Sequence, residues 1–97
     1  MHTAANDRVR GMQEAVVRVR AGFFPGRIWV HAGKPVRLAF DRQEEGACSE
    51  FVEVPQLRVR AHLSPYQATA VEFTPWERGT YDLVCGVGML RGQIIAE

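Results

Sequence analysis

The stretch Val36-Arg37-Leu38-Ala39-Phe40-Asp41 decides the fold class, because a large apolar side chain occupies every second position in it. A period of two puts one set of side chains on a buried face and the other in water, which is the pattern of a half-buried β-strand. The same alternation recurs at residues 17–20, 28–31, 57–63, 71–73 and 81–83. The sequence therefore predicts an all-β protein.

Turn-forming residues separate these stretches, at residues 24–26, 32–35, 45–46, 64–65 and 78–79. Glycine and proline at such places interrupt regular structure. About six to eight short strands with this spacing predict a sandwich or a small barrel. Helix is expected only as a short turn around residues 74–78. We predict a flexible tail over residues 1–12 and a single domain over residues 13–97.

The composition narrows the class of partner. The formal net charge is +1, whereas binding to nucleic acid normally needs a basic stripe. No apolar run approaches the roughly 18–20 residues of a membrane span. Residues 1–13 are polar and do not read as a signal peptide, although a leader removed earlier stays open. We expect a cytoplasmic location rather than a periplasmic or membrane-anchored extracytoplasmic one.

Sulfur-bearing residues carry the strongest chemical signal. The segment Cys85-Gly86-Val87-Gly88-Met89 follows directly on the strand-like residues 79–84, and the only other cysteine is Cys48. A thiol and a thioether four residues apart on a glycine-rich loop can converge on one point. Soft sulfur ligands of this kind suit Cu(I) better than other common biological metals.

The two cysteines also permit a structural interpretation. In an oxidising compartment a Cys48–Cys85 disulfide would close a long loop and stabilise the fold by about 2–4 kcal/mol. The protein would then be a disulfide-stapled β-sandwich that serves as an interaction module. Met89 and the glycines beside Cys85 favour metal binding, but the residues alone leave both interpretations open.

Longer motifs resemble a known family. Ala32-Gly33-Lys34-Pro35-Val36-Arg37-Leu38 resembles the third-strand entry of cupredoxin-like domains. Residues 71–75 and 79–82, followed by Cys85-Gly86, resemble the last hairpin and copper loop of that family. The resemblance extends from about Gln13 to Glu97. It implies a Greek-key β-sandwich of seven or eight strands with little helix.

Within this family the order of the cysteines resembles that of the Cu(I) chaperone domains, which occur alone or fused to copper-exporting P-type ATPases. Their signature is an early cysteine followed by a late Cys-Gly-Met-x-Met-Leu-Arg-Gly segment. The counterparts here are Cys48 and the segment at residues 85–92. The resemblance implies that Cys48 and Cys85 bind Cu(I) as thiolates, with Met89 as a weaker third ligand. It also implies delivery to a copper-exporting P-type ATPase or another copper-transfer protein.

Two departures from related copper sites change the type of site and the number of copper ions that we expect. An electron-transfer cupredoxin uses two histidines, a cysteine and a weak axial methionine. Here Cys48 stands about where the early histidine would be, and no histidine follows Cys85, so a blue-copper redox site is not expected. Val87 replaces the first loop methionine and has no donor atom, so we expect one copper ion rather than two.

Glu50 offers an alternative donor. It lies two residues after Cys48 and would share its face on a strand. A cupredoxin-like domain of a metal-uptake system could use Glu50 with Cys48 and Cys85 to bind oxidised copper or iron. No Ser/His/Asp or Cys/His catalytic set is visible, so we expect the protein not to be an enzyme.

Overall fold

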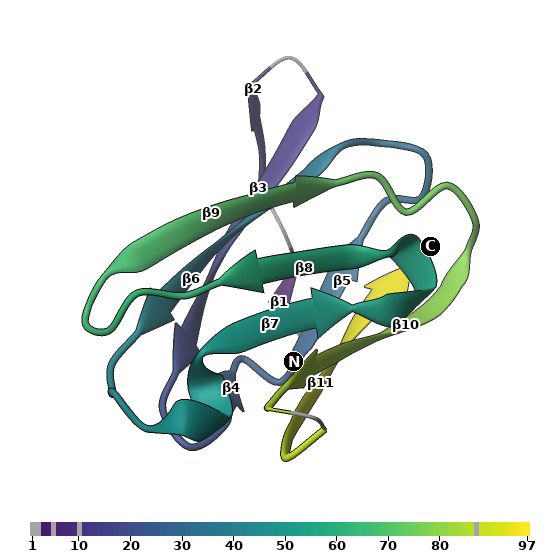
Figure 1. Ribbon diagram of the computed structural model, residues 1–97. Helices are drawn as coiled ribbons and strands as arrows, with labels where there is room; N and C mark the ends of the chain where they lie inside the picture. Colours follow the sequence, from purple (N-terminus) through teal and green to yellow (C-terminus); the bar gives the residue numbers. More distant parts are fainter. Residues whose placement is uncertain (1–2, 5, 10, 87) are drawn as a thin grey trace.

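The computed structural model describes residues 3–4, 6–9, 11–86 and 88–97, which form two packed β-sheets (Figure 1). Sheet A has the order β1 (Thr3–Ala4), β5 (Arg27–Val30), β11 (Leu90–Ala96), β10 (Gly79–Cys85), β7 (Phe51–Val54) and β8 (Val59–His62). Sheet B has the order β2 (Asn6–Val9), β3 (Met12–Val19), β6 (Val36–Arg42) and β9 (Ala68–Phe73), with β4 (Phe23–Phe24) paired to β3. The prediction of an all-β sandwich is confirmed.

The core lies between the sheets and follows the predicted alternation. Along β6, Val36, Leu38 and Phe40 are buried, while the residues between them are exposed or half-buried. The neighbouring strand β3 of the same sheet adds Val17 and Val19. The opposite sheet contributes a matching set: Ile28, Val30, Leu83 and Ile94. Burial of apolar surface between the two faces therefore holds the sheets together.

Gln13 is a polar residue inside this core. It is fully buried at the start of β3, where its side chain joins β3 to the loop after β5. Its Nε2 donates to the carbonyl oxygen of His31 at 2.9 Å, and its Oε1 accepts from the His31 amide at 2.7 Å. A buried amide that is satisfied in this way fixes the register of the segments it connects.

The short helical turn expected around residues 74–78 is not formed, and the short helical turns lie elsewhere in the chain. That segment is a loop, and the 3-10 turns among the described residues are η1 (Ala47–Ser49) and η2 (Pro55–Leu57). The Tyr81 hydroxyl donates to the Glu77 carbonyl oxygen at 2.7 Å and accepts from its amide at 3.3 Å, so these backbone groups are bonded outside a helix. The strand expected over residues 57–63 begins only at Val59, because Arg58 has a left-handed backbone with φ of 55°.

The segment predicted as a tail contains described strands. β1 pairs in parallel with β5, and β2 pairs antiparallel with β3. Residues 1, 2, 5 and 10 lie outside the described residues, and the boundary at residue 13 stays a prediction. Within the described part of the chain, no helix has the length and apolar character needed to span a membrane.

β10 is the strand that positions the predicted ligands. It runs antiparallel to both of its neighbours, and its last residue, Cys85, lies opposite Val52 on β7 and Leu90 on β11. The η1 turn leads directly into β7. The β10–β11 loop and the turn before β7 therefore lie at the same end of the sandwich, at the bottom of Figure 1.

Candidate metal centre

The two cysteine-bearing segments touch through Gly86. A Cβ atom built on Gly86 would overlap the backbone carbonyl oxygen of Cys48 and lie 2.9 Å from its Cα. Gly86 also has a positive φ of 59°, a conformation that side-chain-bearing residues seldom adopt. Glycine at this position thus lets the η1 turn approach the residue that follows Cys85.

Cys85 is the inner member of the pair. Its residue surface is 1% exposed, and its Sγ donates a hydrogen bond to the carbonyl oxygen of Phe51 at 2.8 Å. Burial raises the pKa of the Cys85 thiol to about 11, against the opposing influence of the Arg42 guanidinium and of a hydrogen bond from the Gly86 backbone. Cys85 is therefore a protonated thiol at neutral pH.

Cys48 and Met89 are the outer members. Cys48 is an exposed free thiol in η1, and Met89 is 68% exposed at the end of the β10–β11 loop. Both line a shallow hollow of about 590 Å³, whose remaining walls come from η1, β7, β8 and Gly86: Ala47, Glu50, Phe51, Glu53 and Arg60. Two of the predicted sulfur ligands thus line an open hollow, and the third, Cys85, is buried next to Gly86, which also lines that hollow.

The β10–β11 loop turns back on itself as the glycines predict. Gly88 has a φ of 87°, and the amide of Met89 donates to the carbonyl oxygen of Gly86 at 3.1 Å. The Arg91 guanidinium lies over Gly88, 3.0 Å from the place where a Cβ would stand. This turn directs Met89 to the hollow that Cys48 lines. Val87, on which the expectation of a single ion rests, lies outside the described residues.

An aromatic side chain forms one wall of the hollow. The Phe51 ring lies edge-on to the His62 ring, with centroids 5.2 Å apart, and the Arg60 guanidinium stacks 4.0 Å above the Phe51 centroid. Arg60 also approaches Glu53 at 3.6 Å. The backbone carbonyl of the same Phe51 accepts the hydrogen bond from the Cys85 thiol, so this residue contacts the hollow with its side chain and Cys85 with its backbone.

The alternatives raised by the sequence find less support in this geometry. Both cysteines are free thiols in this structure, so the Cys48–Cys85 disulfide of the alternative interpretation is not present in it. Glu50 approaches His62 at 3.7 Å. Among the described residues, no three side chains drawn from His, Cys, Asp and Glu are grouped closely enough to hold a metal ion. A site made of Cys48, Cys85 and Met89 has only two ligands of these four residue types, so it would not form such a group.

Arg42 is a residue near the site that the sequence reasoning overlooked. It ends β6, is 2% exposed, and bonds to residues on both sides of Cys48. The sequence did contain a signal for its burial, because Arg42 continues the inward-facing series of Val36, Leu38 and Phe40. The charge of Arg42 favours a solvent-facing position, but the alternation along the strand correctly predicts that it is buried.

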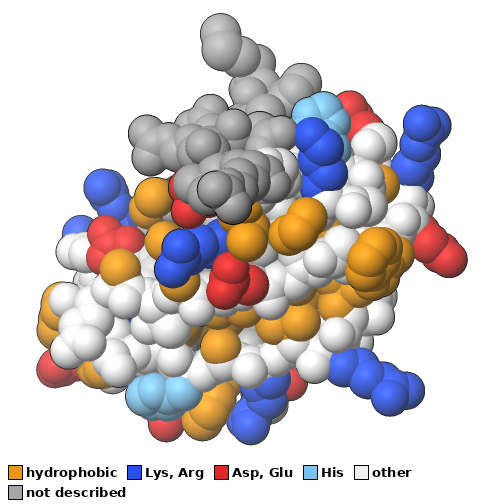
Figure 2. Space-filling view, turned by 90° about the horizontal axis from the view of Figure 1, so that it is seen from above, with side chains coloured by type: hydrophobic (Ala, Val, Ile, Leu, Met, Phe, Trp, Pro, Cys, Tyr) orange, Lys and Arg blue, Asp and Glu red, His pale blue; other side chains and the backbone are white. Residues whose placement is uncertain are grey.

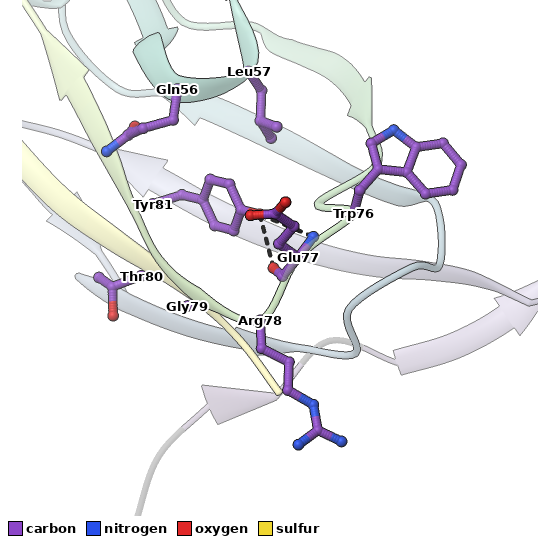
Figure 3. Close-up of a pocket in the computed structure, with 8 residues that line it drawn as sticks. All are labelled: Gln56, Leu57, Trp76, Glu77, Arg78, Gly79, Thr80 and Tyr81. Atoms are coloured by element: carbon purple, nitrogen blue, oxygen red, sulfur yellow. Dashed lines mark hydrogen bonds between the residues drawn. The ribbon is translucent and has the colours of Figure 1, made fainter.

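Other surface features lie away from the cysteines. Figure 3 shows a hollow at the opposite end of β10, where Trp76, Leu57 and Gln56 surround Tyr81, and Trp76 is 74% exposed. On the face seen in Figure 2, the coloured basic and acidic side chains are interspersed and form no single basic patch. No cysteine or methionine is among the residues that line the hollow in Figure 3.

The model of the cupredoxin-like domain matches residues 2–96. The chain belongs to the cupredoxin-like family. Its solved structural neighbours include a copper-binding protein in the apo form, which is 32% identical, with a TM-score of 0.91 and coverage of 100% of this chain and 98% of the other. No curated protein sequence matches the chain.

Two further structural neighbours of this cupredoxin-like domain share its fold at lower sequence identity. The metal-binding domain of the Streptococcus pneumoniae D39 Cu(I)-exporting P-type ATPase CopA, with Cu(I), is 21% identical, with a TM-score of 0.92 and coverage of 98% of this chain and 94% of the other. Auracyanin A, a blue copper protein of Chloroflexus aurantiacus, is 13% identical, with a TM-score of 0.67 and coverage of 90% and 100%. Both likenesses concern the fold.

Proposed function

We propose that this cupredoxin-like domain binds one Cu(I) ion and passes it to a copper-exporting P-type ATPase or another copper-transfer protein. Cys48 and Cys85 supply two thiolates, and Met89 supplies a weaker thioether ligand. The protein acts as a carrier rather than as an enzyme, and copper is its cargo. We place this activity in the cytoplasm, as expected from the sequence.

The contact between Gly86 and the Cys48 backbone is the observation that carries the proposal. It holds together two segments that are far apart in the sequence and that each bear a thiol. Met89 lines the hollow that contains Cys48. The family membership supports the same conclusion, since the solved neighbours include a copper-binding protein and the metal-binding domain of a Cu(I)-exporting ATPase.

The chemistry of loading follows from the state of Cys85. Copper binds the thiolate, so the Cys85 S–H bond must break, its proton passes to solvent, and the Sγ lone pair forms the bond to Cu(I). The hydrogen bond to the Phe51 carbonyl is lost in the same step. No electron is transferred, because Cu(I) enters and leaves in one oxidation state.

The exposure of the outer ligands suits transfer to a partner. Cys48 and Met89 are open to solvent, so a thiol of the acceptor can bind the ion before the carrier's ligands have all dissociated. Ligand exchange of this kind avoids releasing free copper. The thioether is the weaker donor, and we assign it as the ligand that leaves first.

An anaerobic titration of the reduced protein with Cu(I), against a competing Cu(I) chelator, tests the proposal. We expect one tightly bound, colourless equivalent. Cys85→Ser and Cys48→Ser should each weaken binding by more than the roughly 10–100-fold that changes outside the ligand sphere cost. Met12→Leu is the control, because Met12 starts β3 and does not line the hollow.

Two outcomes would oppose the proposal. Unchanged Cu(I) affinity in Cys85→Ser would remove that residue from the ligand set. An intense visible charge-transfer band on titration with Cu(II), at higher affinity than for Cu(I), would favour the metal-uptake alternative that includes Glu50.

A further inference from the structure

Arg42 is a buried cation with a specific set of partners. Its Nε donates to the Ser49 hydroxyl at 2.9 Å, its Nη1 to the Leu63 carbonyl oxygen at 2.7 Å, and its Nη2 to the Gly46 carbonyl oxygen at 2.7 Å. Gly46 immediately precedes the η1 turn that carries Cys48, and Ser49 is the last residue of that turn. The guanidinium thus holds both ends of this turn from the inside.

All three acceptors are neutral. Among the described residues, Arg42 forms no ion pair with a carboxylate. Burial of a charged group is costly unless an opposite charge compensates it. The hydrogen bonds to neutral oxygens satisfy N–H groups of the guanidinium but leave its charge without an opposite charge in an ion pair.

The Cu(I) centre supplies that negative charge when it is loaded. One copper charge and two thiolate charges leave the centre with one net negative charge. Cys85, the buried thiol, already lies within the electrostatic influence of the Arg42 guanidinium. The Glu44 carboxylate also acts on Cys85, but among the described residues it forms no ion pair with Arg42. The loaded protein would place a negative charge at the Cys85 sulfur itself.

We propose that Arg42 is a positioning and charge-compensating residue of the copper centre: it fixes the Cys48 turn, and its charge balances the anionic Cu(I)–dithiolate. This inference rests on the proposed function. The charge-compensating role also predicts that the Arg42 charge favours binding of a monovalent ion over binding of a divalent one. A divalent soft ion such as Hg(II) forms a neutral centre with the same two thiolates and gains nothing from the Arg42 charge.

The experiment compares Ag(I), a redox-stable monovalent analogue of Cu(I), with Hg(II) in competition titrations of each variant. Arg42→Lys and Arg42→Gln form a matched pair, because both lose the guanidinium fork and only the glutamine loses the charge. We expect Arg42→Gln to weaken Ag(I) about tenfold or more relative to Hg(II), the size of effect that loss of one nearby charge produces. Arg42→Lys should keep the ratio of the unmodified protein.

Ser49→Ala separates positioning from charge. It removes the hydroxyl that accepts from Nε and leaves the charge of Arg42 in place. We expect it to weaken Ag(I) and Hg(II) by the same factor. Because the readout is the ratio of two affinities within one variant, a general loosening of the turn cancels from it. Circular dichroism checks the fold, and the rise in Tm on adding each ion gives affinities for a destabilised variant.

Equal ratios in Arg42→Gln and the unmodified protein would overturn the charge-compensating role. An unchanged Ag(I) affinity in both Ser49→Ala and Arg42→Lys would overturn the positioning role. Failure of the proposed function is a separate result, since the unmodified protein would then bind neither Cu(I) nor Ag(I) at one site.

Discussion

The backbone carbonyl of Cys48 lies so close to Gly86 that no side chain fits between them. The two residues belong to η1 and to the start of the β10–β11 loop, which have no direct strand pairing with each other. Their contact makes the spacing between the two cysteines a property of backbone packing. Space at position 86 therefore controls the geometry of the site.

Gly86→Ala should separate the two segments and lower Cu(I) affinity sharply. Gly33→Ala is the matched control, because Gly33 has a φ of 82° with open space around it. The control should cost about 1–2 kcal/mol of stability from backbone strain. Gly86→Ala should cost about 1–3 kcal/mol more through overpacking. Urea unfolding and Cu(I) competition check both effects, and equal Cu(I) affinities in the two variants would contradict the role of this contact.

Cu(I) affinity should rise with pH. The Cys85 thiol holds its proton up to a pKa of about 11, so at any lower pH the ion must displace that proton. We expect the apparent affinity to gain about tenfold per pH unit around neutrality from this group alone. The measurement is the chelator competition repeated at several pH values, corrected for protonation of the chelator itself. A flat profile would mean that Cys85 is not a ligand.

Met89→Leu should weaken Cu(I) binding moderately and leave the fold intact. Met89 is exposed, so leucine at this position loses the thioether without disturbing the core. We expect a smaller loss than for either cysteine and faster transfer of copper to a competing chelator. Met12→Leu is the control. An unchanged rate of transfer in Met89→Leu would show that the thioether does not contact the ion.

Gln13→Ala tests the polar clamp in the core. It removes both hydrogen bonds to the His31 backbone and truncates a fully buried side chain, at a cost of about 2–4 kcal/mol. Gln43→Ala should change stability by less than about 0.5 kcal/mol, because Gln43 is exposed. Denaturant unfolding compares the two. Equal stabilities would show that the clamp contributes little.

Much of the fold follows from side-chain alternation. The inward set of β6 is readable from Val36, Leu38 and Phe40, and the same rule places Arg42 inside. Likewise, Leu83 predicts that Cys85, two residues later on β10, faces the core. For Arg42 the residue type suggested a surface position, whereas the period of the strand placed it inside. For Cys85 the residue type and the period agree on burial.

The remaining part of the site depends on tertiary packing. Cys48 lies in an irregular turn, where alternation gives no information about exposure. Its approach to Gly86 requires the pairing of β7 with β10, which brings together residues that are distant in the sequence. The glycines at positions 86 and 88 indicated a tight loop, but not what would pack against it.

The unequal exposure of the two cysteines has a consequence for chemical damage. Thiolates rather than thiols react with oxidants and alkylating reagents, and access to the sulfur limits the rate. Cys85 is shielded by its burial and by the proton it retains, whereas Cys48 is open to solvent. In the copper-free protein, peroxide or iodoacetamide would therefore attack position 48 first, and inactivation would begin at the rim of the centre.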